Sequence, residues 1–208
     1  MYNFQHKSFT NLGYILCDIP THIRRVLLDE IENIQINNED QTDYRPNLIG
    51  NITSEYELVY SVDALSEFIL AASEEYINTY NYFGPLDFFG EHKDLVLEDL
   101  WVNFQKKGDF NPIHDHRGMF SFVIWVKIPY ELKDELNLYS KSAEPAASVF
   151  SFHYLDILGM MKVLTLPIDK SWEWKMILFP SKLNHSVNPF FTSNELRISV
   201  AGNVCIKS

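Results

Sequence analysis

The first part of the chain carries apolar residues at the spacing of an α-helix in two segments. Between residues 20 and 34 the apolar positions recur every three or four residues, and the same spacing runs over residues 63–80. Such a stripe forms one face of a helix that packs on a core. We therefore predict two helices, with Pro20 in the first turn of one and Asp63 as the N-cap of the other.

From Leu95 onward the apolar period shortens to two residues, which is typical of β-strands. Clusters of Gly, Pro, Asn and Ser separate the candidate strands, which cover residues 95–105, 112–116, 119–128, 148–153, 162–166, 174–179, 184–187 and 196–204. A further short strand over residues 13–17 precedes the first helix. The segment 119–128 is apolar on both faces, so we place it in the middle of a sheet that is covered on both sides.

This succession of short strands predicts a mainly β fold with flanking helices, of the α+β class, in which the strands form a jelly roll or closed barrel. With 208 residues, the chain is long enough for one domain with a substantial core. We divide residues 1–208 into helical and strand support over 1–94 and a β core over 95–208. Residues 37–47 and the glycine- and proline-bearing stretch 84–90 are predicted as loops.

Charge and composition narrow the classes of partner. The net charge of −11 argues against binding to nucleic acid or to an anionic membrane, which requires basic patches. No apolar run approaches the roughly 20 residues of a membrane span, and the N-terminus lacks the pattern of a signal peptide. Cys17 and Cys205 lie at opposite ends of the chain, and we expect both to be reduced, as in a cytoplasmic protein.

Histidines supply the candidate chemistry. In the run Asn111-Pro-Ile-His-Asp-His-Arg-Gly118, His114 and His116 are two positions apart, so on a strand they point to the same face. With His185 they can form a three-nitrogen facial metal site that leaves positions open for other ligands. Asp115 is expected on the opposite face, as a partner of a ligand or as a surface residue. The alternative is that these histidines are ordinary surface residues.

Arg197 is the residue that discriminates between these interpretations. In the strand 196–204 it shares a face with Ser199 and Asn203. A buried arginine requires an anionic partner, and guanidinium pairs bidentately with a carboxylate co-substrate. An ordinary salt bridge or a position at the solvent rim is the alternative.

Four further side chains are candidates for the same pocket. Trp101, Asn103 and Gln105 share one strand face and can line the pocket, although core packing explains Trp101 equally well. Lys127 is a candidate second carboxylate anchor if it points inward with Trp125, and the equally good alternative is an amphipathic lysine at the end of a strand.

In combination, these motifs resemble the iron(II)/2-oxoglutarate-dependent oxygenase superfamily. The resemblance rests on His114-Asp-His116, on Phe179-Pro-Ser181 leading into His185, and on Arg197-Ile-Ser199 with Asn203. The pattern is most similar to a branch that has H-x-H where most members have H-x-D. In that branch a Trp-x-Asn strand and a further Asn precede the pair, like Trp101-Val-Asn103 and Asn111 here. The resemblance covers about residues 95–204.

The resemblance implies a double-stranded β-helix in which His114, His116 and His185 bind iron(II). Arg197, aided by Ser199, would bind the distal carboxylate of 2-oxoglutarate. Such an enzyme uses O₂, forms succinate and CO₂, and usually hydroxylates its prime substrate, here a small molecule or a protein side chain. We expect no nucleic-acid or membrane partner.

Two departures matter. His116 stands where most members of the superfamily have a carboxylate ligand and leaves the metal site one negative charge poorer. The segment Ser121-Phe-Val-Ile-Trp125 lacks the Ser-Gly and aromatic pair of the branch, so the pocket wall differs. Two other functions fit the residues: a cupin-like three-histidine metalloenzyme that does not use 2-oxoglutarate, and a β-sandwich binding protein without catalytic activity.

Overall fold

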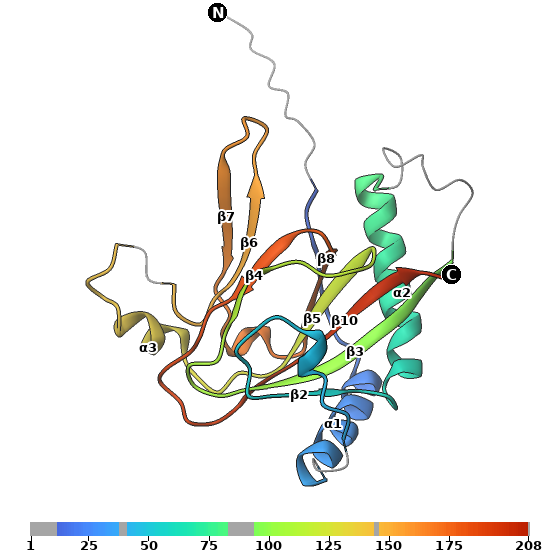
Figure 1. The fold of residues 1–208 in the computed structure, drawn as a ribbon, viewed down its shortest axis with the longest axis horizontal. Helices are drawn as coiled ribbons and strands as arrows, with labels where there is room; N and C mark the ends of the chain where they lie inside the picture. Colours follow the sequence, from blue (N-terminus) through green and yellow to red (C-terminus); the bar gives the residue numbers. More distant parts are fainter. Residues whose placement is uncertain (1–11, 38–40, 83–93, 144–145, 208) are drawn as a thin grey trace, which may run out of the picture.

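A computed structural model describes residues 12–37, 41–82, 94–143 and 146–207 (Figure 1). The N-terminal part holds β1 (Ile15–Asp18), α1 (Thr21–Ile36), a 3₁₀ turn (Arg45–Asn47), β2 (Ser54–Glu57) and α2 (Val62–Tyr80). The remainder holds β3 (Leu95–Gln105), β4 (Asn111–His114), β5 (Phe120–Lys127), α3 (Leu132–Asn137), β6 (Phe150–Leu155), β7 (Met161–Leu166), a 3₁₀ turn (Lys170–Trp172), β8 (Lys175–Pro180), β9 (Asn184–Val187) and β10 (Arg197–Ile206). The predicted loop over residues 84–90 lies outside the described residues.

The strands form two antiparallel sheets. The larger sheet has the order β1-β8-β5-β10-β3-β2, and the smaller has the order β4-β9-β6-β7. The prediction of a mainly β, jelly-roll architecture is confirmed, and β5 lies between β8 and β10 as its two apolar faces indicate. β1 and β2 come from the first part of the chain and join the larger sheet through β8 and β3.

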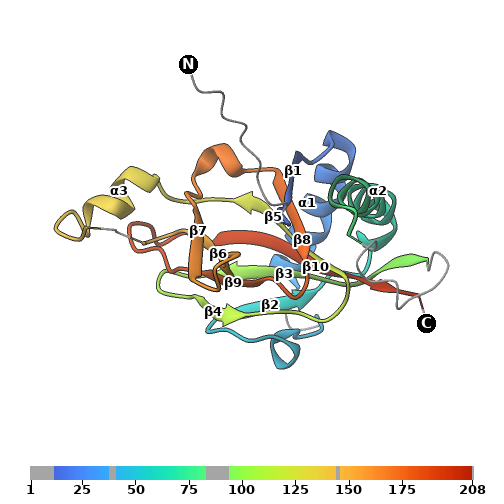
Figure 2. The ribbon, with the colours of Figure 1, turned by 90° about the horizontal axis from the view of Figure 1, so that it is seen from above.

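The two helices cover the outer face of the larger sheet (Figures 1 and 2). Their apolar stripes, including Leu27 of α1 and Ile69 of α2, pack with the outward side chains of the sheet, such as Ile124 and Val200. Burial of this apolar surface is the main stabilising contribution to the fold. Gly202 of β10 leaves room for the ring of Phe122, because a Cβ atom at this position would lie only 2.6 Å from that ring.

A second core lies between the two sheets. It contains aromatic side chains from both sheets, among them Trp125 and Phe179 of the larger sheet and Phe150 and Phe152 of the smaller one. These rings contact one another edge to face, with centroids 5.0 Å apart for Phe150–Phe152 and for Phe152–Phe179. Edge-to-face packing of this kind is the preferred geometry of aromatic pairs. One end of the space between the sheets is therefore filled.

The structure corrects the prediction for the start of α2. The N-cap position is Ser61 and not Asp63, which lies within the first turn of the helix. The buried carboxylate of Glu30 on α1 accepts hydrogen bonds from the backbone N–H groups of Val59, Tyr60 and Ser61. A long-range contact thus supplies the acceptor that a local cap would have supplied.

Two elements, β2 and α3, were not predicted. The sequence of β2 is Ser-Glu-Tyr-Glu, which shows no alternation of apolar and polar residues, and the six residues of α3 are too few to show a helical period. None of the helices in the described part of the chain is long and apolar enough to cross a membrane.

Candidate active site

The smaller sheet brings the three predicted histidines together. His114 is the last residue of β4, His185 lies opposite it on β9, and His116 follows two residues after the end of β4. One ring nitrogen from each histidine lies within 4.8 Å of the others. The ring centroids are 4.3 Å apart for His114–His185, 4.9 Å for His114–His116 and 5.1 Å for His116–His185.

The position of His116 differs from the prediction that it lies on a strand. β4 ends at His114, so strand alternation does not place the two rings together. Instead, the backbone N–H of His116 donates to the carbonyl of Ser181, at 2.9 Å. Ser181 in turn follows directly after β8, in the larger sheet. A contact to the other sheet therefore brings the His116 ring toward the other two.

Hydrogen bonds to the backbone fix two of the rings in a metal-binding tautomer. Nδ1 of His114 lies 2.7 Å from the carbonyl of Pro112, and Nδ1 of His185 lies 3.0 Å from the carbonyl of Leu183. A carbonyl oxygen only accepts, so Nδ1 carries the proton and Nε2 keeps its lone pair. This arrangement is the usual one for histidines that bind a metal through Nε2.

Burial keeps all three imidazoles neutral. Desolvation lowers the pKa of His114, brings the pKa of His116 down to about 4, and holds the pKa of His185 well below its ordinary value. Loss of water disfavours the charged form of an imidazole, and neighbouring histidines add to this effect at His116 and His185. A neutral imidazole is the form that coordinates a metal ion.

A narrow cavity between the sheets, of about 50 Å³, extends from the histidines. It is lined on the side of the larger sheet by Trp101, Asn103, Gln105 and Ser199. The Asn103 amide accepts from the Trp101 indole N–H at 3.2 Å and donates to the Ser199 hydroxyl at 3.2 Å. The predicted pocket face of β3 therefore does face the space next to the histidines.

Three apolar residues that line this cavity were not predicted. Leu48, Ile49 and Ile52 come from the connection between α1 and β2. The adjacent apolar residues Leu48 and Ile49, within a polar stretch, are the only feature of the sequence that could have indicated a buried position. The sequence does not reveal which part of the fold such a loop contacts.

Arg197 is buried behind the wall of the cavity, with only 2% of its surface exposed. Its three hydrogen bonds go to neutral oxygens: Nε donates to Gln105 Oε1 at 2.8 Å, Nη1 to the Tyr130 hydroxyl at 3.2 Å and Nη2 to the Asn188 carbonyl at 3.1 Å. The guanidinium also lies 5.3 Å from the centre of the Phe190 ring.

The side chain of Arg197 lies behind Gln105 and does not line the cavity directly. Within the described part of the chain it makes no ion pair, so the alternative of an ordinary salt bridge does not apply. A buried guanidinium without a counter-ion favours an anionic ligand nearby.

On the other side of the histidines lies a wider, polar opening of about 470 Å³. Its wall includes His114 and His116 together with Tyr44, Asp99, Asp115, Arg117, Lys182 and Asn203. Asp115 pairs with Lys182 at 3.1 Å and is not among the residues that could share a metal ion. Its expected position as a surface residue is confirmed.

Lys127 does not reach the cavity, which contradicts its prediction as a second carboxylate anchor. Its side chain is exposed and forms an ion pair with Glu195, at 2.6 Å. The register between β5 and β10 shifts at Ile198, so that Lys127 pairs with Ile198 while Trp125 pairs with Ser199. Because this β-bulge interrupts the alternation of inward and outward side chains along β5, Lys127 does not share the inward face with Trp125.

These groups fit iron(II) and a keto-acid. Three neutral imidazoles with free Nε2 atoms suit a divalent transition metal and leave the remaining coordination positions open. The buried positive charge of Arg197, together with the hydroxyl of Ser199, suits a carboxylate.

The two facing antiparallel sheets are those of a double-stranded β-helix, and the histidine cluster lies between them. Residues 99–203, about half of the chain, match the family described as "Putative 2OG-Fe(II) oxygenase". The chain belongs to this family of iron(II)- and 2-oxoglutarate-dependent oxygenases, which are hydroxylating enzymes that use O₂. The sequence matches no curated protein.

Two solved structures share the fold. A prolyl-4-hydroxylase from Pseudomonas putida is 17% identical, with a TM-score of 0.51 over 95% of this chain and 94% of that one. A prolyl hydroxylase from Trichoplax adhaerens, solved with a peptide fragment of the hypoxia-inducible factor, is 12% identical, with a TM-score of 0.52 over 92% of this chain and 82% of that one. At these identities the likeness concerns the fold.

Proposed function

We propose that His114, His116 and His185 hold the iron(II) of this oxygenase. The observation that carries the assignment is the convergence of their ring nitrogens within 4.8 Å in the part of the fold that the family match covers. The backbone acceptors of His114 and His185 support it, because they turn Nε2 toward the common centre.

We further propose that Arg197 and Ser199 bind the distal carboxylate of 2-oxoglutarate, with Trp101 and Asn103 along the wall of its pocket. Arg197 supplies the compensating charge, and the Ser199 hydroxyl supplies a hydrogen bond inside the cavity. The contacts to Tyr130 and Asn188 hold the guanidinium in place before the ligand binds. Such preorganisation lowers the entropic cost of binding.

When bound, iron and 2-oxoglutarate supply the oxidising chemistry, in which O₂ is consumed, succinate and CO₂ form, and a substrate C–H bond becomes C–OH. The protein positions the reactants on two sides of the histidines. The narrow cavity holds the keto-acid, and the polar opening around Tyr44 and Asp99 admits the prime substrate. A protein side chain or a small molecule can enter by this route.

The neutral ligand set has a consequence for the metal. His116 contributes no negative charge where most relatives in the superfamily have a carboxylate, so the site attracts iron(II) less strongly. The anionic co-substrate then supplies a larger part of the charge compensation. We expect iron(II) and 2-oxoglutarate to bind cooperatively, each tightening the binding of the other.

The test begins with the wild-type protein under nitrogen. Iron(II) plus 2-oxoglutarate should produce a metal-to-ligand charge-transfer band, and admission of O₂ should release succinate. The substitution Arg197→Met should raise the 2-oxoglutarate concentration needed for half of the band by about 100-fold, since a charged hydrogen bond contributes about 1.5–3 kcal/mol and further charge stabilisation is lost.

Zinc affinity without the keto-acid serves as the control, because Arg197 lies away from the histidines. If the band and succinate formation are absent from the wild type, the function is wrong. If both survive Arg197→Met unchanged, the 2-oxoglutarate site is assigned incorrectly. A wild type that binds metal but shows neither the band nor succinate formation would favour the cupin-like enzyme.

A further inference from the structure

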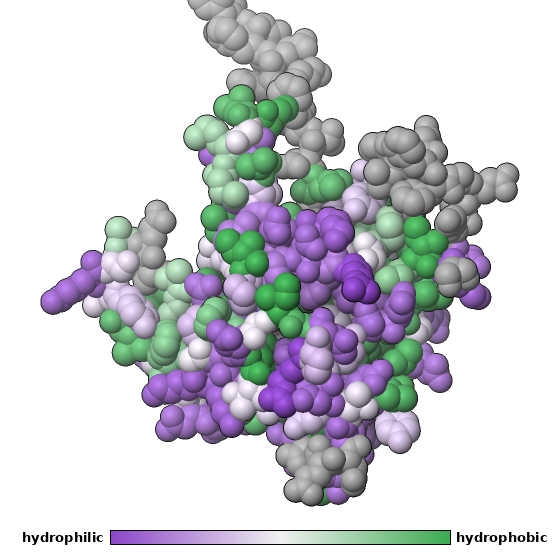
Figure 3. Space-filling model, in the orientation of Figure 1, coloured by the Kyte–Doolittle hydropathy of each residue, from purple (hydrophilic) through white to green (hydrophobic). Residues whose placement is uncertain are grey.

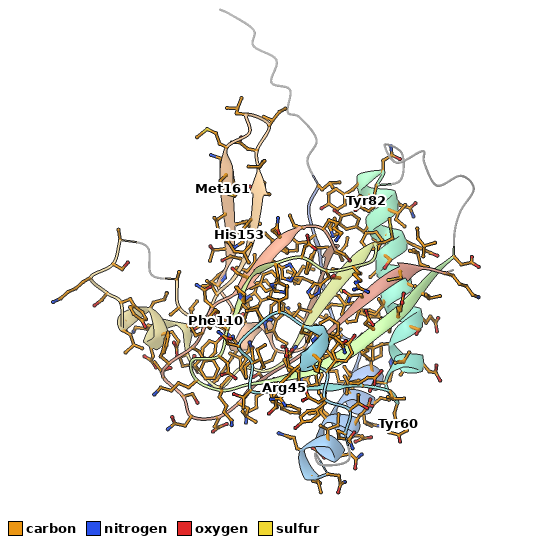
Figure 4. All side chains as sticks on the ribbon, viewed as in Figure 1. Arg45, Tyr60, Tyr82, Phe110, His153 and Met161 are labelled. Carbon is orange, nitrogen blue, oxygen red and sulfur yellow. The ribbon has the colours of Figure 1, made fainter. Side chains whose placement is uncertain are left out.

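The hairpin formed by β6 and β7 exposes a large apolar surface. Seven of its side chains, between 41% and 79% exposed, are Leu155, Ile157, Leu158, Met160, Met161, Val163 and Leu164. Figure 3 shows apolar surface at the end of the hairpin, and Figure 4 marks Met161 on β7. Because neighbouring strand residues point to opposite sides, these side chains lie on both faces of the hairpin. An accumulation of exposed apolar side chains of this size marks an interaction site in a folded protein.

The same hairpin carries an unpaired strand edge. β7 is the last strand of the smaller sheet, and within the described part of the chain it pairs only with β6, which leaves one row of its backbone donors and acceptors without a strand partner there. Edge strands are usually protected by charged side chains. The one charged residue of β7 is Lys162, which pairs with Asp156 of the hairpin turn. β7 is thus suited to accept a further strand.

An apolar cavity of about 340 Å³ lies beside the hairpin. Leu155 and Leu164 of the hairpin line it together with Phe152 and Leu183. Lys182 lines both this cavity and the polar opening beside His114 and His116. An extended ligand that fills the cavity can therefore continue past Lys182 toward the histidines.

We propose that β7 and the adjoining apolar cavity bind an extended segment of a protein substrate, whose side chain is hydroxylated. A polypeptide supplies the backbone partners for the edge of β7 and apolar side chains for the cavity. It is also long enough to reach the histidines, whereas a free amino acid or a nucleotide cannot contact the hairpin and the opening together. This inference depends on the proposed function for the hydroxylation itself, and it adds that the substrate of that reaction is a protein.

Binding can be measured independently of turnover. A library of random twelve-residue peptides is selected on the enzyme loaded with iron(II) and 2-oxoglutarate under nitrogen, and the enriched peptides are synthesised with a fluorescent label. Anisotropy titrations then compare the wild type with Val163→Asp and Leu164→Asp. Leu138→Asp is the matched control, since Leu138 on the α3 side is 56% exposed and Val163 is 54% exposed.

We expect both hairpin substitutions to weaken peptide binding at least tenfold, and Leu138→Asp to leave it unchanged. In air, the peptides should increase succinate formation by the wild type and not by Leu164→Asp. Basal succinate formation without peptide should be equal in all the proteins.

Three results would overturn the proposal. The first is that no peptide is enriched, and the second is that Val163→Asp and Leu164→Asp bind the peptides as tightly as the wild type does. The third is a wild-type dimer that Val163→Asp converts to a monomer. The last would identify the hairpin as a contact between two copies of the chain. A wild type that binds the peptides but never forms succinate would disprove the reaction and leave the docking surface intact.

Discussion

The two faces of the larger sheet are built from the same strands and serve opposite purposes. On β10, Ile198, Val200 and Val204 belong to the apolar core under the helices, whereas Arg197, Ser199 and Asn203 are buried polar residues of the other face. Adjacent residues of a strand point to opposite sides. One segment of chain can therefore stabilise the fold with alternate residues and build a site with the others.

The inner face is rigid for a different reason than the outer one. Its polar side chains hydrogen-bond in pairs across neighbouring strands: Asn103 with Ser199, Ser121 with Asn203, and Asn203 with Asp99. Buried polar groups are costly unless they are paired, so these contacts fix single rotamers. The outer face depends instead on the amount of apolar surface that it buries. Substitutions on the two faces should therefore affect different properties.

The largest effect is expected at the histidines. His185→Ala removes one of three ligands. Loss of a residue that only hydrogen-bonds to a metal ligand lowers metal affinity by up to about 100-fold, so we expect iron(II) affinity to fall by more than this. Metal content after desalting measures this loss. His153→Ala is the control, because His153 lies on β6, bonds to Ser186, and is not part of the triad. Equal metal loss in both variants would contradict the assignment.

On the outer face, Ile124→Ala should reduce stability without altering the site. Ile124 is fully buried under the helices, and deletion of such a side chain costs about 2–5 kcal/mol of unfolding free energy. Urea denaturation measures the loss. The neighbouring Val123→Ala, on the cavity side, should cost less, because Val123 is only half-buried. Reduced 2-oxoglutarate affinity in folded Ile124→Ala would show that the two faces are not independent.

Acid should destabilise the metal-free protein through the inner face. The pKa of His116 is about 4 in the folded protein and about 6.5 when unfolded, so the unfolded state takes up its proton first. Stability is therefore complete above about pH 6.5 and declines as the pH falls toward 4, by at most about 3 kcal/mol for this residue. Urea denaturation between pH 7 and pH 4 measures the decline, and His116→Gln should show a shallower one.

The smallest effect is expected for Ser199→Ala. The substitution removes one hydroxyl from the proposed carboxylate site and one partner of Asn103. A single hydrogen bond contributes about 0.5–1.5 kcal/mol, so half-saturation by 2-oxoglutarate should require about two- to tenfold more ligand. Zinc affinity should not change. A loss as large as that of Arg197→Met would mean that Ser199, and not Arg197, is the main carboxylate anchor.

Much of the fold and the candidate site could be predicted from local pattern. β3 and β9 have the predicted bounds, and the strands around them differ by a few residues at their ends. His114, His185, Asn103 and Ser199 lie around a common space, as predicted from their residue types and strand faces, whereas His116 reaches it from beyond the end of β4. Lys127 was placed wrongly because a single β-bulge reverses the facing of every residue beyond it.

The sequence by itself determined the alternation of apolar and polar positions, and with it the two faces of the sheet and the residue types available for chemistry. Tertiary structure alone decided that His116 reaches the other histidines through the Ser181 carbonyl, that Arg197 makes no ion pair with another described residue, and that the cavity beside the apolar hairpin shares Lys182 with the opening at the histidines. Local pattern follows from backbone geometry within a few residues. These three features depend on contacts between segments far apart in the chain, which no period records.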